Sequence, residues 1–208
     1  MMNLLDNLFQ NYPQLSFLKD DILKSFDMIS NAFKNNGKLF LCGNGGSAAD
    51  CEHIAGELMK NFNFKRALTD KQKTVFENAS LSKEFYSNLQ PALLAISLTD
   101  NTALSTAIIN DMNPDFIFAQ KLFALASKND ILLSISTSGN SSNIINAVKT
   151  AKALSVKTIL LTGDTGGKLK DLCDISICVP ASLTYRIQEF HLPIYHCLCA
   201  MLEKKFFF

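Results

Sequence analysis

Five short apolar runs recur along the chain, and helical patterns separate most of them. The first run begins at Leu39 and ends in a glycine-rich turn, and the others cover residues 93–98, 131–136, 157–162 and 174–179. The helical patterns cover residues 46–61, 114–127, 141–154 and 183–205. The later runs lack clean polar alternation, which is typical of parallel strands buried on both faces. This alternation predicts an α/β domain of three layers, with a doubly wound parallel five-stranded sheet between helices.

Two segments fall outside the alternation. Residues 3–36 carry apolar positions at helical spacing with a break at Pro13, so we expect an N-terminal helical region over residues 1–36. Residues 62–90 mix charges, Asn and Ser without a clear period, and we expect an insertion that could hold one short helix. The chain has 208 residues in all, and residues 37–208 suit one domain with a sizeable core.

Composition argues against several classes of protein. The formal net charge of +1 predicts no basic face, so nucleic acid is not an expected partner. The longest apolar runs, such as Ile131-Leu132-Leu133, are too short to span a bilayer, and the early Asp6 without a basic start argues against a signal peptide. The six cysteines lack zinc or disulfide spacing and predict buried thiols of a reducing compartment. We therefore expect a cytoplasmic protein with no membrane partner.

The turn after the first apolar run reads Gly43-Asn44-Gly45-Gly46-Ser47, and a helical pattern starts directly after it. Glycines let the backbone approach a ligand without Cβ clashes, and the first amides of a helix attract an anion. Ser47 is well placed to cap the helix and to present its hydroxyl. The turn therefore suits a phosphate or a sugar hydroxyl, and a plain connection between elements stays the alternative. It is not a Walker A loop, because no Gly-Lys-Ser/Thr follows.

A second helix-opening loop reads Ser136-Thr137-Ser138-Gly139-Asn140-Ser141-Ser142. Its hydroxyls surround a predicted helix N-terminus, which favours phosphate binding over a helix start that is merely well capped. Ligands of doubly wound sheets bind beyond the carboxyl ends of the strands. The two loops together indicate that one ligand could span both.

Four further side chains could hold a metal or move protons. His53 and Glu57 lie four residues apart and share a helix face, which suits two ligands of one metal or a carboxylate placed for proton abstraction. Taken alone, however, the pair favours the plainer interpretation, in which an exposed Glu lies beside a half-buried His without a functional role. Gln188 and His196 would lie about 12 Å apart along an unbroken helix. Their side chains could reach one metal if they bend toward each other or if a second chain contributes to the site. Chemistry alone favours a polar stripe on an amphipathic helix.

Asn110-Asp111 end a short helical stretch before Pro114. Their chemistry is compatible with a plain turn or with the edge of a site.

These segments together resemble the sugar isomerase (SIS) family, and within it the phosphoheptose isomerases. The resemblance covers about residues 38–203 apart from 62–90, a segment longer than the usual connection in the family. It is carried by residues 43–47, 53–57, 110–111, 135–141, 161–168 and 186–196. It implies the flavodoxin-like SIS fold and an aldose–ketose isomerase that converts sedoheptulose 7-phosphate to D-glycero-D-manno-heptose 7-phosphate through an enediol(ate). That reaction is the first step toward nucleotide-activated heptose for surface polysaccharide, in lipopolysaccharide or capsule.

The resemblance also implies roles for single residues. The phosphate would bind Ser136, Thr137, Ser138 and Ser141. The remaining substrate contacts would come from Asn44, Gly45, Gly46, Ser47, Glu57, Gln188, Asn110 and Asp111. One zinc ion (Zn²⁺) per subunit of a homotetramer would be held by His53, Glu57, Gln188 and His196. Glu57 and His196 would also be the catalytic acid/base pair.

Two other functions occur on this fold. A tetrameric regulator of bacterial replication initiation binds the initiator protein without known catalysis and has a similar pattern, including Cys197-Leu198-Cys199. It lacks equivalents of Glu57 and His196, whose presence here favours the enzyme. A sugar-phosphate-sensing module would need the hydroxyl-rich loop alone.

Overall fold

The computed structural model describes residues 2–208, and within them five strands form one sheet. The strands are β1 (Leu39–Gly43), β2 (Ala95–Ser97), β3 (Ile131–Ser136), β4 (Lys157–Thr162) and β5 (Ile175–Cys178). Their order is β2-β1-β3-β4-β5, and every neighbouring pair is parallel. The predicted doubly wound parallel sheet is confirmed.

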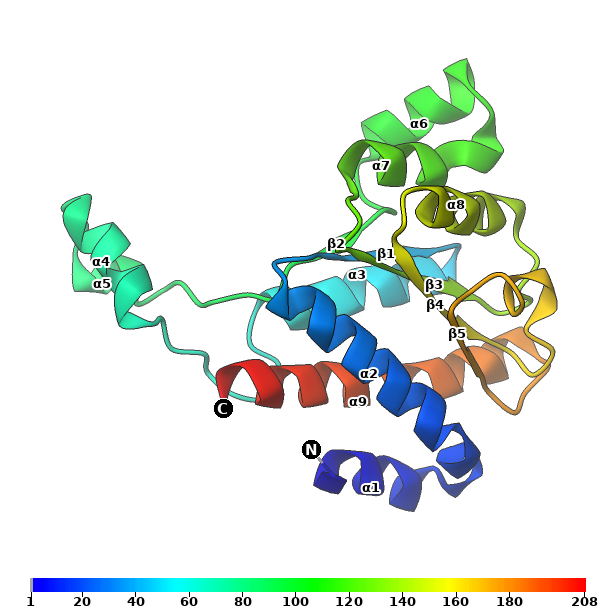
Figure 1. Ribbon diagram of the computed structural model, residues 1–208, viewed down its shortest axis with the longest axis horizontal. Coiled ribbons are helices and arrows are strands. Elements are labelled where there is room, and N and C mark those ends of the chain that lie inside the picture. The colour runs from blue at the N-terminus through cyan, green and yellow to red at the C-terminus, as the bar shows by residue number, and fades with distance from the viewer. Residues whose placement is uncertain (1) are drawn as a thin grey trace.

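Helices cover both faces of this sheet (Figure 1). One face carries α2 (Lys19–Lys34), α3 (Gly46–Met59) and α9 (Thr184–Phe207), and the other carries α7 (Ile117–Leu125) and α8 (Ser142–Ala153). Short 3-10 segments, η2 (Pro114–Phe116) and η3 (Gly167–Leu169), connect elements. Phe40 and Leu41 of β1 belong to different buried clusters, because successive side chains of a strand point to opposite faces. The three layers therefore enclose two cores.

The N-terminal region is helical as expected, with its break at Pro13. Helix α1 (Met2–Asn11) is followed by the 3-10 segment η1 (Pro13–Leu18), and α2 begins at Lys19. Leu5 and Leu8 of α1 are buried in the same cluster as Ile194 and Leu198 of α9. The N-terminal helices therefore complete the core on the α9 face.

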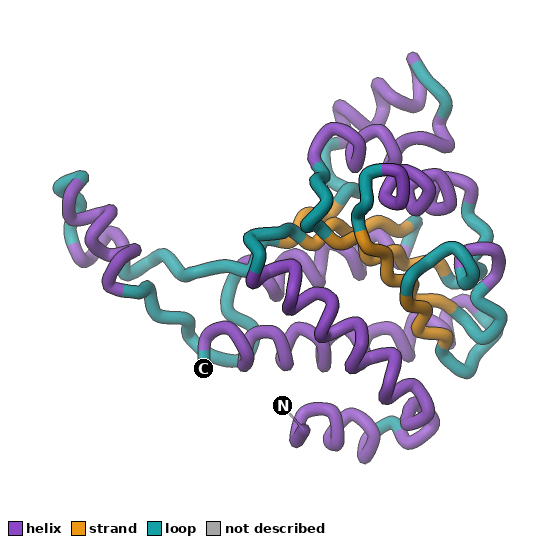
Figure 2. The backbone as a smooth tube through the Cα atoms, viewed as in Figure 1, coloured by secondary structure: helices purple, strands orange, loops and turns teal. Residues whose placement is uncertain are grey.

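The segment 62–90 contains two helices, α4 (Asp70–Asn78) and α5 (Lys83–Tyr86), where the sequence indicated at most one. Both stand away from the sheet at the end of two long loop stretches (Figures 1 and 2), and we call residues 68–90 the arm. Thr69 and Gln72 form a capping box at the start of α4, and Phe76 stacks on Tyr86 with ring centroids 5.9 Å apart. The arm is therefore held together by local contacts.

The cysteines and the apolar segments can be followed from the sequence into the fold. Cys42, Cys51, Cys197 and Cys199 are buried thiols as expected, whereas Cys173 and Cys178 are only half-buried. No helix within residues 2–208 has the combined length and apolarity needed to cross a membrane.

Candidate active site

The two helix-opening loops meet at the carboxyl edge of the sheet. Because β1 and β3 are neighbours in register, the loops that follow them lie side by side. A cavity of about 270 Å³ lies between them and is lined by Asn44, Gly45, Gly46, Ser47, Ile135, Ser136, Thr137, Ser141, Thr184 and Gln188. The structure thus brings most of the predicted substrate-binding residues together around one space. Helix α6 (Thr102–Asp111) carries Asn110 and Asp111, which do not line this cavity; the Asn110 amide donates to Asp111 Oδ1 at 2.7 Å.

The glycines of the first loop have definite structural roles. Gly45 has φ +57° at the N-terminus of α3, a conformation that L side chains rarely adopt. A Cβ on Gly46 would lie 2.4 Å from Nε2 of Gln188. Gly46 therefore allows α9 to bring Gln188 against the loop.

The hydroxyl of Ser141 is not used to cap the helix that it precedes. Ser141 is the N-cap residue of α8, yet within residues 2–208 its side chain accepts no hydrogen bond from the first amides of that helix. Its Oγ lies 3.4 Å from Oγ of Ser136. Ser138 differs, because it is exposed, accepts from the Asn140 amide at 3.2 Å and does not line the cavity.

Asn143 does not line the cavity but supports it through Asn44, and the sequence interpretation missed it. Its side-chain amide and that of Asn44 exchange two hydrogen bonds, of 3.0 and 2.9 Å. This pair fixes the glycine loop against the start of α8. The available signal was its position two residues after Ser141, on the first turn of the helix opened by the hydroxyl-rich loop.

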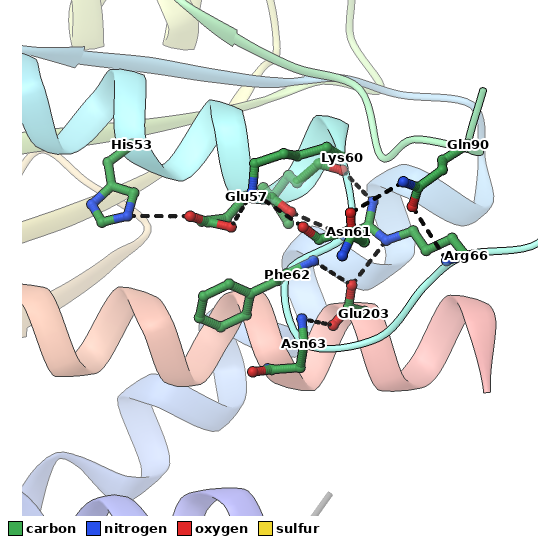
Figure 3. A network of polar contacts seen from close by, with 10 residues as sticks. His53, Glu57, Lys60, Asn61, Phe62, Asn63, Arg66, Gln90 and Glu203 are labelled. Atoms are coloured by element: carbon green, nitrogen blue, oxygen red, sulfur yellow. Dashed lines mark hydrogen bonds and ion pairs between the residues drawn. The ribbon is translucent and has the colours of Figure 1, made fainter. Parts of the chain in front are cut away.

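His53, Glu57 and His196 gather between α3 and α9 (Figure 3 shows His53 and Glu57 pointing from α3 toward α9). Nε2 of His53 lies 3.3 Å from Oε1 of Glu57, while Oε2 of Glu57 accepts from Lys60 at 2.9 Å. The rings of His53 and His196 meet edge to face with centroids 4.9 Å apart. Gln188 lines the cavity two helical turns before His196. The predicted four-residue metal set is therefore divided, with Gln188 at the cavity and His53, Glu57 and His196 in the cluster between α3 and α9.

Burial shifts the pKa values of two side chains in and beside this cluster. Burial is the larger of two causes that lower the pKa of His196, and repulsion from a protonated His53 is the smaller. The His196 ring is therefore neutral at pH 7. Burial also raises the pKa of the Asp50 carboxyl, which the Tyr195 hydroxyl and the His53 charge partly offset. The Tyr195 hydroxyl donates to Oδ1 of Asp50 at 3.1 Å and lies 3.1 Å from Nδ1 of His53.

The residue types of the cluster fit a zinc ion. Nε2 of His196 is buried and has no hydrogen-bond partner in the described part of the chain. An imidazole nitrogen in that state, beside a second imidazole and a carboxylate, is the donor set that zinc prefers. No three His, Cys, Asp or Glu side chains of residues 2–208 already surround a common metal position. Holding a metal would therefore require His53, Glu57 and His196 to turn toward one point.

A buried ion pair anchors the chain that follows α3. Oε1 of Glu203 in α9 accepts from Nε of Arg66 at 3.0 Å, and the same carboxylate accepts from the amides of Phe62 and Asn63 at 2.7 Å each (Figure 3). Both charged side chains have 0% exposure. The end of α3 and the base of the arm are thereby fixed on α9.

Comparisons with known proteins agree with this geometry. A family model described as the SIS domain matches residues 14–90 and 85–163. Phosphoheptose isomerase from a Nitratiruptor species is 43% identical over 84% of this chain and 81% of its own length, and that from Aliarcobacter butzleri is 40% identical over 90% and 87%. The solved phosphoheptose isomerase from Neisseria gonorrhoeae superposes with a TM-score of 0.75 at 31% identity, covering 96% of this chain and 95% of that one. The chain therefore belongs to the phosphoheptose isomerase family of SIS-domain proteins.

Proposed function

We propose that this protein is an aldose–ketose isomerase that converts sedoheptulose 7-phosphate to D-glycero-D-manno-heptose 7-phosphate. One observation carries the proposal: α3 and α9 each contribute both to the hydroxyl-lined cavity and to the His–Glu–His cluster. Ser47 and Gln188 line the cavity, and His53 and His196 belong to the cluster. A phosphate site and acid/base groups on the same two helices suit a sugar phosphate held at one end and reacting at the other. Membership of the family supports the same substrate.

The cavity supplies the proposed phosphate site. Ser136, Thr137 and Ser141 line the cavity beside the N-terminus of α8, whose dipole attracts an anion. Ser138 lies on the same loop, and its resemblance-based role stays a prediction. We assign Asn44, Gly45, Gly46, Ser47 and Gln188 to the sugar hydroxyls. Asn110 and Asp111 are proposed for the outer edge of the site.

The cluster supplies the proposed acid/base pair. The Glu57 carboxylate would take a proton from C1 of the ketose, and the electron pair would form the C1–C2 double bond of an enediol(ate). The proton would return to C2, while O1 loses its hydrogen as the new carbonyl forms. His196 would move a proton between O1 and O2 with the ring nitrogen that does not hold the metal. The reaction would be the first step toward nucleotide-activated heptose for lipopolysaccharide or capsule.

We also propose one zinc ion per subunit. His53, Glu57 and His196 would hold it, and the role of Gln188 as fourth ligand rests on the family resemblance alone. A zinc ion there would act as a Lewis acid toward the sugar oxygens.

We propose a cytoplasmic homotetramer with a sugar phosphate as its small-molecule partner and with neither nucleic acid nor membrane. Large apolar side chains at the surface support further association, among them Phe64, Val75 and Phe85 with exposures of 53%, 62% and 52%. They lie on or beside the arm, which buries none of the residues of α4.

The activity is tested by incubating the protein and zinc with sedoheptulose 7-phosphate and recording proton NMR spectra. We expect an aldose anomeric signal to appear and to be absent with Glu57→Gln prepared in parallel. Lack of the signal with the zinc-loaded wild type would contradict the proposed substrate.

A further inference from the structure

A tyrosine connects the cluster to a second carboxylate. Tyr195 precedes His196 on α9 and is 1% exposed although it carries a hydroxyl. That hydroxyl lies 3.1 Å from both Oδ1 of Asp50 and Nδ1 of His53. The Tyr195 ring also meets the His53 and His196 rings edge to face, with centroids 5.6 and 4.9 Å apart. The Tyr195 ring therefore contacts both histidines, and its hydroxyl has two polar neighbours, Asp50 and His53.

The supply of protons decides the direction of these hydrogen bonds. An ionised carboxylate can only accept, and a tyrosine hydroxyl has one proton to donate. The Asp50 carboxylate oxygen lies 3.1 Å away and takes that proton as acceptor. The Tyr195 oxygen can then only accept from His53, so Nδ1 of His53 must carry a hydrogen.

The other ring nitrogen of His53 faces Glu57. With the proton on Nδ1, a neutral ring has its lone pair on Nε2, and Nε2 lies 3.3 Å from Oε1 of Glu57. The lone pair of Nε2 and the Glu57 carboxylate oxygen would repel each other at that distance, and a cation bound by both removes this repulsion. Ligating histidines usually donate their second nitrogen to a neighbouring group, which fixes the tautomer.

We propose that Tyr195, held by Asp50, is a positioning residue that keeps the His53 proton on Nδ1 and leaves Nε2 to bind a cation beside Glu57. The inference rests on the proposed function only for the identity of that cation as zinc. Without the Tyr195 hydroxyl, Nδ1 loses its acceptor. The proton would then move to Nε2, where Glu57 accepts it and the metal-binding lone pair is lost.

The first test needs no metal and no activity. Metal-free protein labelled with ¹⁵N-histidine is studied by long-range ¹H–¹⁵N correlation at about pH 8, and histidine substitutions assign the three rings, at positions 53, 191 and 196. We expect a protonated Nδ1 for His53 in the wild type and a protonated Nε2 with a bare Nδ1 in Tyr195→Phe. A bare Nδ1 in the wild type, or an unchanged ring in the variant, would overturn the proposal. Tyr185→Phe is the matched control, because Tyr185 is 59% exposed on the same helix.

The second test measures zinc affinity by competition with a chelator. Loss of a partner that orients a metal-binding histidine weakens metal binding by about 10–100-fold. We expect that loss in Tyr195→Phe and the wild-type affinity in Tyr185→Phe. Equal affinities in all three proteins would overturn the proposal. If the wild type binds no zinc, the proposed metal is wrong, and the position of the His53 proton is still decided by NMR.

Discussion

The guanidinium of Arg66 donates a hydrogen bond from Nη2 to the main-chain carbonyl of Glu57, 3.0 Å away. Nη1 donates to the carbonyl of Leu58 at 2.7 Å, and Nε donates to Glu203 (Figure 3). The last carbonyls of a helix lack partners within it, and Arg66 donates to two of them; the Leu58 carbonyl also accepts from the Leu93 amide at 3.0 Å. A residue beyond α3 thereby fixes the turn that carries the proposed base.

Breaking this ion pair should destabilise the protein strongly. Arg66→Met leaves the Glu203 carboxylate buried without its cation, which typically costs about 3–5 kcal/mol. Urea unfolding followed by circular dichroism measures the loss. Arg186→Met is the control, because the Arg186–Glu189 pair is exposed and its removal should leave the unfolding free energy unchanged. Equal unfolding curves for Arg66→Met and the wild type would contradict the importance of the buried pair.

Glu57→Gln should abolish isomerisation and leave the fold intact. The amide keeps nearly the same shape but cannot accept the C1 proton, and a positioned acid or base contributes about 10²–10⁴-fold to a rate. The rate of aldose formation measures the effect, and circular dichroism checks the fold. Glu52→Gln, on an exposed position of the same helix, should keep wild-type activity. Activity of Glu57→Gln within a few-fold of the wild type would exclude Glu57 as the base.

Ser141→Ala should weaken binding of the sugar phosphate. The hydroxyl lines the cavity and does not cap α8, so its loss should remove a ligand contact without loosening the helix. A hydrogen bond to a charged group is worth about 1.5–3 kcal/mol, which corresponds to about a tenfold or greater rise in dissociation constant. Calorimetric titration into the inactive Glu57→Gln background measures it. Ser16→Ala, at an exposed position in η1, is the control, and equal affinities of the two would remove Ser141 from the phosphate site.

The alternation of apolar runs was sufficient to predict the sheet, but not the ends of its strands. Leu93 and Leu98 flank β2 and are buried, at 6% and 1% exposure, although the paired residues cover only 95–97. An apolar pattern reports burial, and burial extends past the three paired residues of β2, although the Leu98 amide still donates to the Leu41 carbonyl at 2.8 Å. The arm shows the opposite case, because α4 buries no residue and therefore needs no apolar period. The spacing of Thr69 and Gln72, which form the capping box, was a local signal that the sequence interpretation did not use.

The loops of the site were predictable because their chemistry is local. Glycines, hydroxyls and a helix start are adjacent in the sequence, and neighbouring parallel strands bring two such loops together. Arg66 was not predictable in this way, because its partner Glu203 lies 137 positions later. Tyr195 resembles any aromatic residue of a buried helix until Asp50 and His53 are placed beside its hydroxyl.

His191 should make the stability depend on pH. Its ring is fully buried, and burial lowers its pKa from 6.5 to about 4, an effect that the Thr162 backbone offsets only in part. Between those values the unfolded chain binds a proton that the folded chain does not, so the unfolding free energy falls as pH drops from 6.5 to 4. At pH 5 this amounts to about 2 kcal/mol relative to neutral pH.

His191→Leu should remove that part of the pH dependence. Urea unfolding of the wild type and the variant at about pH 7.5 and pH 5 measures it, and the variant should lose less stability on acidification. Parallel losses in the two proteins would show that His191 is protonated in the folded state at pH 5.

Each active site should take Glu57 and His196 from the same chain. The His53 ring contacts His196 and its Nε2 faces Glu57 within one chain, so a second subunit is not needed to join the acid/base pair. Light scattering should first give a particle of four times the 23.0 kDa chain mass. Mixed tetramers made by dissociating and reassembling Glu57→Gln with His196→Ala should then stay inactive, because every site keeps one defective partner. Wild-type protein treated in the same way is the control for reassembly. Recovered activity in the mixture would instead show that the two residues of a site come from different subunits.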